Sequence, residues 1–197
     1  MMKAISILMI LLIPAWSFGA EAVKLKHVAS AYADEAGVGI KQPEGVDCND
    51  QAGFIVADTG NGRLVPYRLQ EGAVKAGKEI KIPELSYPLT VKMTSKGAMI
   101  VLDGVKRRLL RVNPDGSFKG YLDPAGLPSS GAVVPKSFAI DQEDNVYVLD
   151  IFSERVLVLG PEGGFQRQIG FPADYGFIAD IAVDRRGTVF LVDSVRA

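Results

Sequence analysis

The chain has 197 residues but only one cysteine, Cys48, and one histidine, His27. A single cysteine excludes an intramolecular disulfide, and no Cys-rich run is present to hold haem, zinc or an iron–sulfur cluster. A single histidine excludes a metal site built from several histidines and makes any His-based triad depend on His27 alone. Cys48 stands in an apolar alternation, which predicts a small core residue rather than a reactive thiol. We expect no cofactor and no bound metal.

An excess of charge of one sign is also lacking, because the formal net charge is only −1. No general field therefore favours nucleic acid or an anionic membrane. The basic stretch Lys106-Arg107-Arg108, followed by Arg111, could suggest RNA. The net charge and the expected export argue against that, and a cluster of charges at an exposed strand edge explains it.

Long apolar runs are absent except near the N-terminus, where Ile7 to Ile13 are uninterrupted. Lys3 precedes this run and the small residues Ser17 to Ala22 follow it, an order typical of a secretory signal peptide. The run is shorter than the roughly 20 residues that a membrane-spanning helix needs. We expect residues 1–22 to be a signal peptide, with cleavage after Gly19, Ala20 or Ala22, and residues 23–197 to form the exported fold, periplasmic or extracellular. No cysteine stands directly after the cut, so we expect no lipid attachment.

The sequence contains an internal repeat with a period near 45 residues. Four short apolar runs each end in an aspartate, and the aspartates are spaced by 45, 47 and 43 residues. The aspartates are Asp58, Asp103, Asp150 and Asp193. A turn-forming residue stands nine positions before each of them: Asn49, Thr94, Asp141 and Asp184. A proline precedes the first three by fifteen positions (Pro43, Pro88, Pro135), and an arginine follows them by five (Arg63, Arg108, Arg155). All these offsets would not recur together by chance, so the repeat is real.

Each unit predicts four short antiparallel strands separated by Gly, Pro, Asn and Asp. In the first unit we expect strands over residues 45–48, 54–58, 63–69 and 79–82. Four antiparallel strands at this period describe one blade of a β-propeller, so the predicted fold is all-β with almost no helix.

The repeats resemble those of the NHL family. The first unit carries the resemblance best, with Pro43-Glu44-Gly45-Val46, then Phe54 to Asp58 and the loop Thr59-Gly60-Asn61-Gly62-Arg63. The third unit matches well, the second lacks the Gly/Asn-rich loop, and the fourth has Ile178 in place of the proline. The resemblance covers residues 43–197 and implies a propeller that is usually six-bladed.

The chain contains three full blades and half of a fourth. The simplest interpretation is a truncated six-bladed propeller, since six blades need roughly 270 residues. A closed four-bladed ring that lacks one strand is the alternative. Residues 22–29 alternate like a strand and are predicted to supply the outermost strand of a closing blade.

The recurring aspartates and arginines are predicted to be structural. An Asp and an Arg separated by a four-residue loop face each other across a hairpin, and such a pair contributes roughly 0.2–1 kcal/mol. We expect the pairs Asp58–Arg63, Asp103–Arg108 and Asp150–Arg155, with Asp193 as the fourth aspartate. A pair repeated in every blade is scaffold rather than a catalytic site.

The loops between the second and third strands, and those between blades, share one face of the predicted propeller. Rigid scaffolds carry function on such loops, and Lys106, Arg107, Phe152 and Tyr175 are the candidate ligand-binding residues. We expect a non-catalytic scaffold that binds a protein, peptide or glycan. A hydrolase or lactonase-like propeller with part of its site in further blades is one alternative, and the sensor portion of a larger envelope protein is another. Asn49, Asp141 and Asp184 could suggest the calcium site of a lactonase-like propeller, but turn chemistry accounts for them.

Overall fold

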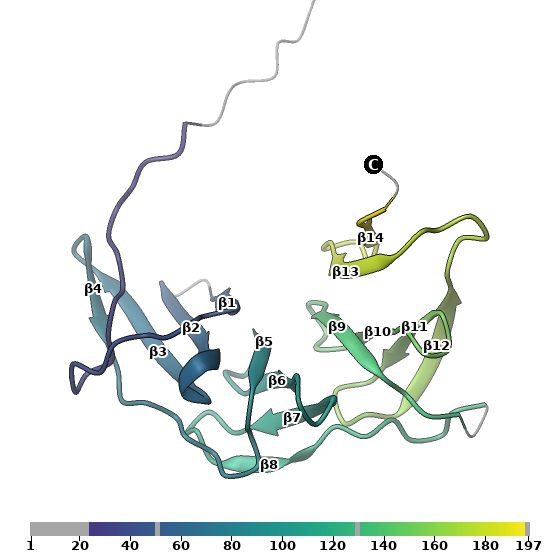
Figure 1. The fold of residues 1–197 in the computed structure, drawn as a ribbon, viewed down its shortest axis with the longest axis horizontal. Coiled ribbons are helices and arrows are strands. Elements are labelled where there is room, and N and C mark those ends of the chain that lie inside the picture. Colours follow the sequence, from purple (N-terminus) through teal and green to yellow (C-terminus); the bar gives the residue numbers. More distant parts are fainter. Residues whose placement is uncertain (1–23, 50–51, 129–130, 196–197) are drawn as a thin grey trace, which may run out of the picture.

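A computed structural model describes residues 24–49, 52–128 and 131–195. Three four-stranded antiparallel sheets and one two-stranded sheet follow one another along the chain (Figure 1). Sheet 1 contains β1 (Gly45–Cys48), β2 (Gly53–Asp58), β3 (Arg63–Gln70) and β4 (Ala73–Ala76). Sheet 2 contains β5 (Pro88–Met93), β6 (Met99–Asp103), β7 (Arg108–Val112) and β8 (Phe118–Tyr121). Sheet 3 contains β9 (Pro135–Ile140), β10 (Val146–Asp150), β11 (Arg155–Leu159) and β12 (Phe165–Gly170), and sheet 4 contains β13 (Ile178–Val183) and β14 (Val189–Asp193).

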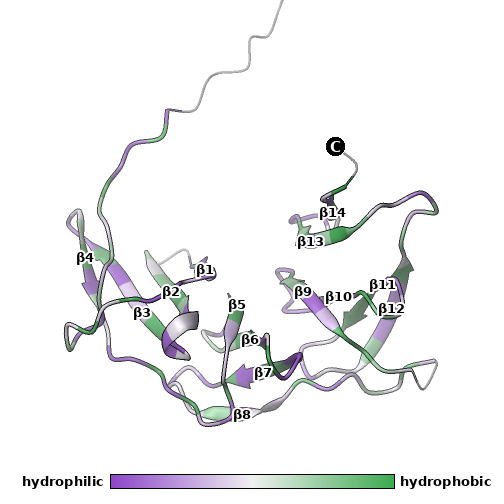
Figure 2. Cartoon of the chain, viewed as in Figure 1, coloured by the Kyte–Doolittle hydropathy of each residue, from purple (hydrophilic) through white to green (hydrophobic). Residues whose placement is uncertain are grey.

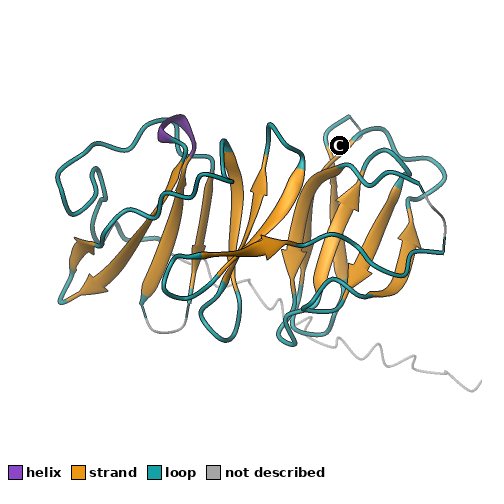
Figure 3. Ribbon diagram, turned by 90° about the horizontal axis from the view of Figure 1, so that it is seen from below, coloured by secondary structure: helices purple, strands orange, loops and turns teal. Residues whose placement is uncertain are grey.

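The sheets stand side by side along an arc, with their first strands on its inner side and β4, β8 and β12 on the outside (Figure 1). Figure 3 shows the same row of sheets turned by 90°. We letter the strands of each sheet a to d in chain order. The only helix among the described residues is the 3-10 turn η1 (Thr59–Asn61). The predicted all-β propeller architecture, with three full blades and half of a fourth, is therefore confirmed.

Because neighbouring strands run in opposite directions, the turns fall on two opposite ends of the sheets. The turns between strands b and c, called bc turns below, lie at residues 59–62, 104–107 and 151–154. Residues 194–195, which follow strand b of sheet 4 at the same end, are counted with them. The connections between one sheet and the next lie at the same end. The turns between strands a and b, called ab turns, lie at the other end.

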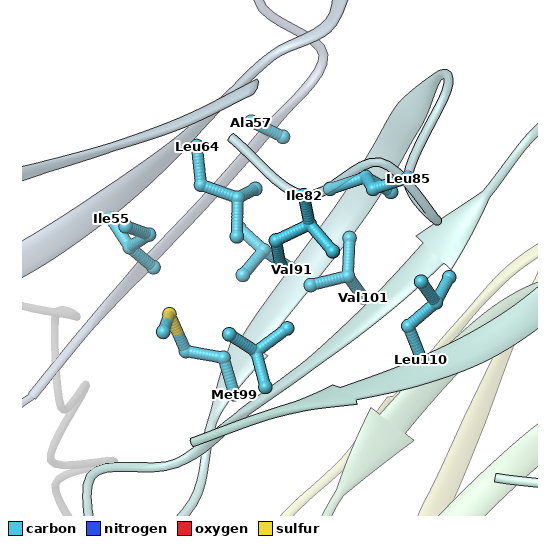
Figure 4. Close-up of a cluster of buried hydrophobic side chains, with 10 residues drawn as sticks. Ile55, Ala57, Leu64, Ile82, Leu85, Val91, Met99, Val101 and Leu110 are labelled. Atoms are coloured by element: carbon cyan, nitrogen blue, oxygen red, sulfur yellow. The ribbon is translucent and has the colours of Figure 1, made fainter. Parts of the chain in front are cut away.

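The core lies between the sheets rather than inside any one of them. Successive side chains of a strand point to opposite faces, so β6 and β10, the b strands of sheets 2 and 3, each contribute one set to the sheet before them and another to the sheet after them. Ile55 and Ala57 of β2 pack with Val91 and Val101 of sheet 2 in one such cluster (Figure 4). Two equivalent clusters join sheets 2 and 3 and sheets 3 and 4. Hydrophobic stretches on the strands supply these layers (Figure 2).

The outer strand of sheet 1 differs from the prediction. Strand d was expected over residues 79–82, but β4 is Ala73–Ala76 and pairs with β3. Glu71 and Gly72 make the hairpin turn with φ of 50° and 77°, the left-handed values that a two-residue turn of this kind requires. Residues 79–82 contribute only an isolated bridge, between Ile80 and Leu64.

Two predictions near the N-terminus are wrong. Residues 24–29 form no strand, although a donated outer strand was expected there. Residues 31–42 instead form an arm that packs Ala31 and Ile40 against Val56, Val65 and Tyr67 of sheet 1. Cys48 is exposed rather than buried, because it ends β1 and lines an open cavity there.

The predicted signal peptide, residues 1–22, lies outside the described residues. In the part of the chain that the structure describes, no helix is long and apolar enough to cross a membrane.

Candidate functional site

The repeated aspartate at the end of each b strand fastens the bc turn to the connection that precedes its own sheet. Asp58, Asp103 and Asp150 have fully buried side chains. Each of the four aspartates accepts a hydrogen bond from a backbone N–H located 16 or 17 residues earlier. The donors are Lys41 (2.7 Å), Ser86 (2.6 Å), Val134 (3.0 Å) and Gly176 (2.6 Å). These bonds tie each bc turn to the connection that precedes its own sheet.

Arginine joins this arrangement in sheets 1 and 3. Arg63 Nε lies 2.6 Å from Asp58, and Arg155 Nε lies 3.2 Å from Asp150. Both guanidinium groups are buried, so these are not the solvent-exposed cross-strand pairs for which a contribution below 1 kcal/mol is typical. Breaking a buried pair leaves an uncompensated charge and costs about 3–5 kcal/mol.

Arg63 also holds the N-terminal arm. Its Nη1 lies 2.5 Å from Asp34 and 2.9 Å from Glu79. A hydrogen bond from the Val38 N–H, together with Arg63, lowers the pKa of Asp34. The arm and sheet 1 are thus joined by an ion cluster with one arginine at its centre.

Sheet 2 departs from the predicted pairing, because Arg108 does not contact Asp103. Arg108 pairs with Asp123 at 2.6 Å and lies 3.7 Å from the centre of the Tyr121 ring. Asp103 is occupied by the turn itself, since one of its oxygens accepts bonds from the N–H groups of Val105 and Lys106. Asp103 and Arg108 do face each other across the hairpin, as predicted, but the ion pair expected between them is not formed.

The four candidate ligand-binding residues all lie at the bc end of the sheets but do not form one cavity. Lys106 and Arg107 are exposed on the bc turn of sheet 2, and Phe152, on the next bc turn, has 67% of its surface exposed. Tyr175 is half-buried against Phe171, with ring centres 5.1 Å apart. A hydrogen bond to Glu154 and burial raise the pKa of Tyr175. Tyr175 is thus partly a packing residue.

The opposite end of the arc contains a cavity that sequence reasoning missed. The cavity is about 700 Å³ in volume, and we call it the ab hollow. Residues from all four sheets line it, including the four turn formers Asn49, Thr94, Asp141 and Asp184. Their regular spacing of nine residues before each repeated aspartate was the available signal, because it places all four on one rim.

The carboxylates of the ab hollow are used by its own turns. Asp141 accepts bonds from the N–H of Asn145 and the hydroxyl of Tyr147. The N–H of Thr188 holds the pKa of Asp184 low. Asp144 of sheet 3 accepts two bonds from Ser95 of sheet 2, both 2.7 Å long, and so ties two turns together.

Two cations and one unpartnered hydroxyl remain in the ab hollow. Lys96 and Arg185 line it, and the side-chain oxygen of Thr94 is buried without a hydrogen-bond partner. This arrangement can bind a polar or anionic small molecule.

Metal-ligating residues are scattered. Within residues 24–49, 52–128 and 131–195, no three His, Cys, Asp or Glu side chains gather as a metal site would require. His27 is hydrogen-bonded to Ser30 on the exposed N-terminal stretch, and Cys48 lines the ab hollow.

Comparisons with known proteins support the fold. No family model matches the chain, and no curated protein matches it. Among solved structures, an inactive virginiamycin B lyase from Staphylococcus aureus with quinupristin aligns with a TM-score of 0.57 at 14% identity, over 77% of this chain and 48% of that one. A candidate 6-phosphogluconolactonase from Bacteroides uniformis aligns with a TM-score of 0.58 at 11% identity, over 80% of this chain and 52% of that one. The chain therefore has a propeller-like fold and spans about half the length of these structures.

Proposed function

We propose that the chain is part of an exported NHL-type β-propeller that binds a protein, peptide or glycan partner without catalysis. The partner is placed on the bc turns and the connections beside them. The repeat register supports the NHL assignment, and the order of Lys3, apolar run and small residues supports export.

One observation carries the proposal. The repeated aspartates hold the bc turns from beneath through hydrogen bonds to their N–H groups, while Arg107 and Phe152 are exposed above them. Lys106 is exposed as well, and its ammonium group donates to the carbonyl of Glu84. A rigid surface loses little conformational entropy on binding, so exposed side chains on it contribute more of their contact energy to affinity. The buried carboxylates are engaged in the turns, as expected of scaffold residues.

A second candidate is a small-molecule enzyme that uses the ab hollow. The volume of this cavity suits a ligand of several hundred Å³, and two structural neighbours are named as a lyase and a candidate lactonase. In that case Lys96 and Arg185 would hold an anionic group of the substrate.

Matched variants separate the two functions. We expect Phe152→Ser to weaken binding of the protein to peptide and glycan arrays by about tenfold, and Lys96→Ala to leave that binding unchanged. We expect the wild-type chain and both variants to show no lactone opening, because the binding proposal assigns the chain no catalytic activity. Lactone opening by the wild type that is lost in Lys96→Ala would replace the binding proposal with the enzymatic one.

Export has its own test. Mass spectrometry of the protein expressed from the full chain should find a new N-terminus after residue 19, 20 or 22, in the exported fraction. An intact Met1 in a soluble cytoplasmic product would contradict export and leave the binding experiment unaffected.

A further inference from the structure

The bc turns share an exposed apolar position. The residue two places after the repeated aspartate is Gly60, Val105, Phe152 and Val195 in sheets 1 to 4. In the last three sheets this side chain has 67–69% of its surface exposed. Single exposed hydrophobic residues are ordinary on protein surfaces. Their return at one position after three consecutive b strands marks this end of the sheets as a row of exposed apolar side chains.

A second apolar position lies beside the first. Tyr87 and Phe177 stand sixteen residues before the repeated aspartates of sheets 2 and 4, and both are exposed, by 36% and 46%. Backbone bonds fix each one against its own bc turn: the Gly104 N–H donates to the Tyr87 carbonyl at 2.8 Å, and the Ser194 N–H donates to the Phe177 carbonyl at 2.9 Å.

These five residues, Tyr87, Val105, Phe152, Phe177 and Val195, form what we call the bc patch. Sheet 1 does not share it, since its equivalent residues are Gln42 and Gly60. The bc patch therefore follows sheets 2 to 4.

The charge beside the bc patch is positive. Lys106 and Arg107 adjoin Val105, and the ammonium group of Lys136 lies 5.9 Å from the centre of the Phe177 ring. Two carboxylates also lie nearby, since Glu44 accepts a bond from the Tyr87 hydroxyl and Glu154 is bonded to Tyr175. The ammonium group of Lys106 donates to the backbone carbonyl of Glu84. Among the described residues none of these three cations is in a salt bridge, and an apolar row with such cations at its margin is complementary to apolar side chains flanked by carboxylates.

Resting on the proposed binding function, we propose that the bc patch binds an acidic peptide segment of a partner protein that carries aromatic or aliphatic side chains. The apolar side chains of the segment lie on the row from Val105 to Val195. Its carboxylates pair with Lys106, Arg107 and Lys136. Aromatic anchors and exposed cations are the residue types that dominate such interfaces.

An array of short synthetic peptides of defined composition tests this assignment. The four classes are apolar-acidic, apolar-basic, acidic without apolar residues, and polar neutral. We expect selective binding of the apolar-acidic class. Fluorescence anisotropy with a bound apolar-acidic peptide should show affinity about tenfold weaker for Phe152→Ser, and about tenfold weaker for the double variant Lys106→Glu with Arg107→Glu. The double variant should also shift selection toward apolar-basic peptides.

The matched control is Tyr32→Ser, because Tyr32 is 78% exposed on the N-terminal arm and outside the bc patch. This variant should bind like the wild type. Binding that ignores peptide composition, or that survives both patch variants, overturns the inference. Stronger binding to vesicles of phosphatidylcholine and phosphatidylglycerol than to any peptide overturns it as well. Binding to a glycan array alone overturns this inference but leaves the proposed scaffold function standing.

Discussion

The repeated aspartate does more than pair with an arginine. Asp150 accepts bonds from the N–H groups of Val134 and Phe152 and from Arg155. Its side chain is fully buried and so is Arg155, so without the carboxylate the guanidinium group would be left in a place that water reaches poorly. The cost of removing such a group is dominated by the partners left unsatisfied.

Asp150→Ala should therefore lower the free energy of unfolding by about 3–5 kcal/mol, because the buried Arg155 loses its carboxylate. Asp103→Ala should cost only about 1–3 kcal/mol, since Asp103 satisfies backbone N–H groups but no arginine. Urea unfolding of the two variants, monitored by circular dichroism, measures the difference. Equal losses would contradict the role assigned to Arg155.

The location of the aspartates was predictable from the sequence, but their partners were not. A residue that recurs in register indicates a repeated backbone position, which is enough to place Asp58, Asp103 and Asp150 at strand ends. Whether Arg108 turns inward or outward depends on Asp123 and Tyr121, which come from elsewhere in the unit. No local sequence pattern predicts which partner Arg108 has.

Individual strands were predicted best where apolar residues alternate between turn formers. Strands a to c of sheet 1 fall close to their expected positions, whereas strand d was misplaced. Ala73–Ala76 has weak strand propensity, and its pairing depends on the Glu71-Gly72 turn and on β3. The ab hollow was missed for a related reason. The cavity arises because several sheets stack side by side, and the sequence of any one of its turns predicts only that turn.

The N-terminal arm is held to sheet 1 by a titratable contact. Asp34 has a pKa below its ordinary value of 3.8 in the folded protein. Because the folded-state pKa is the lower one, this contact stabilises the arm fully above pH 3.8 and is lost as the pH falls through the folded-state pKa.

Acidification below about pH 3.8 should therefore release the arm. Hydrogen exchange at Val38 and Ile40, corrected for the intrinsic effect of pH, should rise as Asp34 is protonated. Asp34→Asn should show the faster exchange already at neutral pH and little further change at these two amides. If the variant and the wild type rise together on acidification, another group controls the arm.

At the scale of the whole molecule, the sheets form a row in which each contacts only its neighbours. Three separate clusters join sheets 1 and 2, sheets 2 and 3, and sheets 3 and 4. Stability in such a row is approximately a sum of terms for single units and for neighbouring pairs. Sheet 4 has two strands and packs on sheet 3 alone, so it should open at a lower free energy than the sheets between neighbours.

Two matched core variants test this arrangement. Leu102 and Leu149 both stand one residue before a repeated aspartate and are 1% and 0% exposed. Leu102 belongs to the cluster between sheets 2 and 3, and Leu149 to the cluster between sheets 3 and 4. Each change to alanine should cost about 2–5 kcal/mol at its own interface.

The consequences should differ along the chain. Leu149→Ala should speed native-state hydrogen exchange in β13 and β14 while β6 and β7 keep wild-type protection, because only the terminal sheet is released. Leu102→Ala should speed exchange in strands on both sides of its interface, since it divides the row near its middle. Exchange measured by mass spectrometry on peptides from each strand distinguishes the two patterns. A uniform increase over all strands in Leu149→Ala would show that the sheets unfold as one cooperative unit, and the nearest-neighbour description would then be wrong.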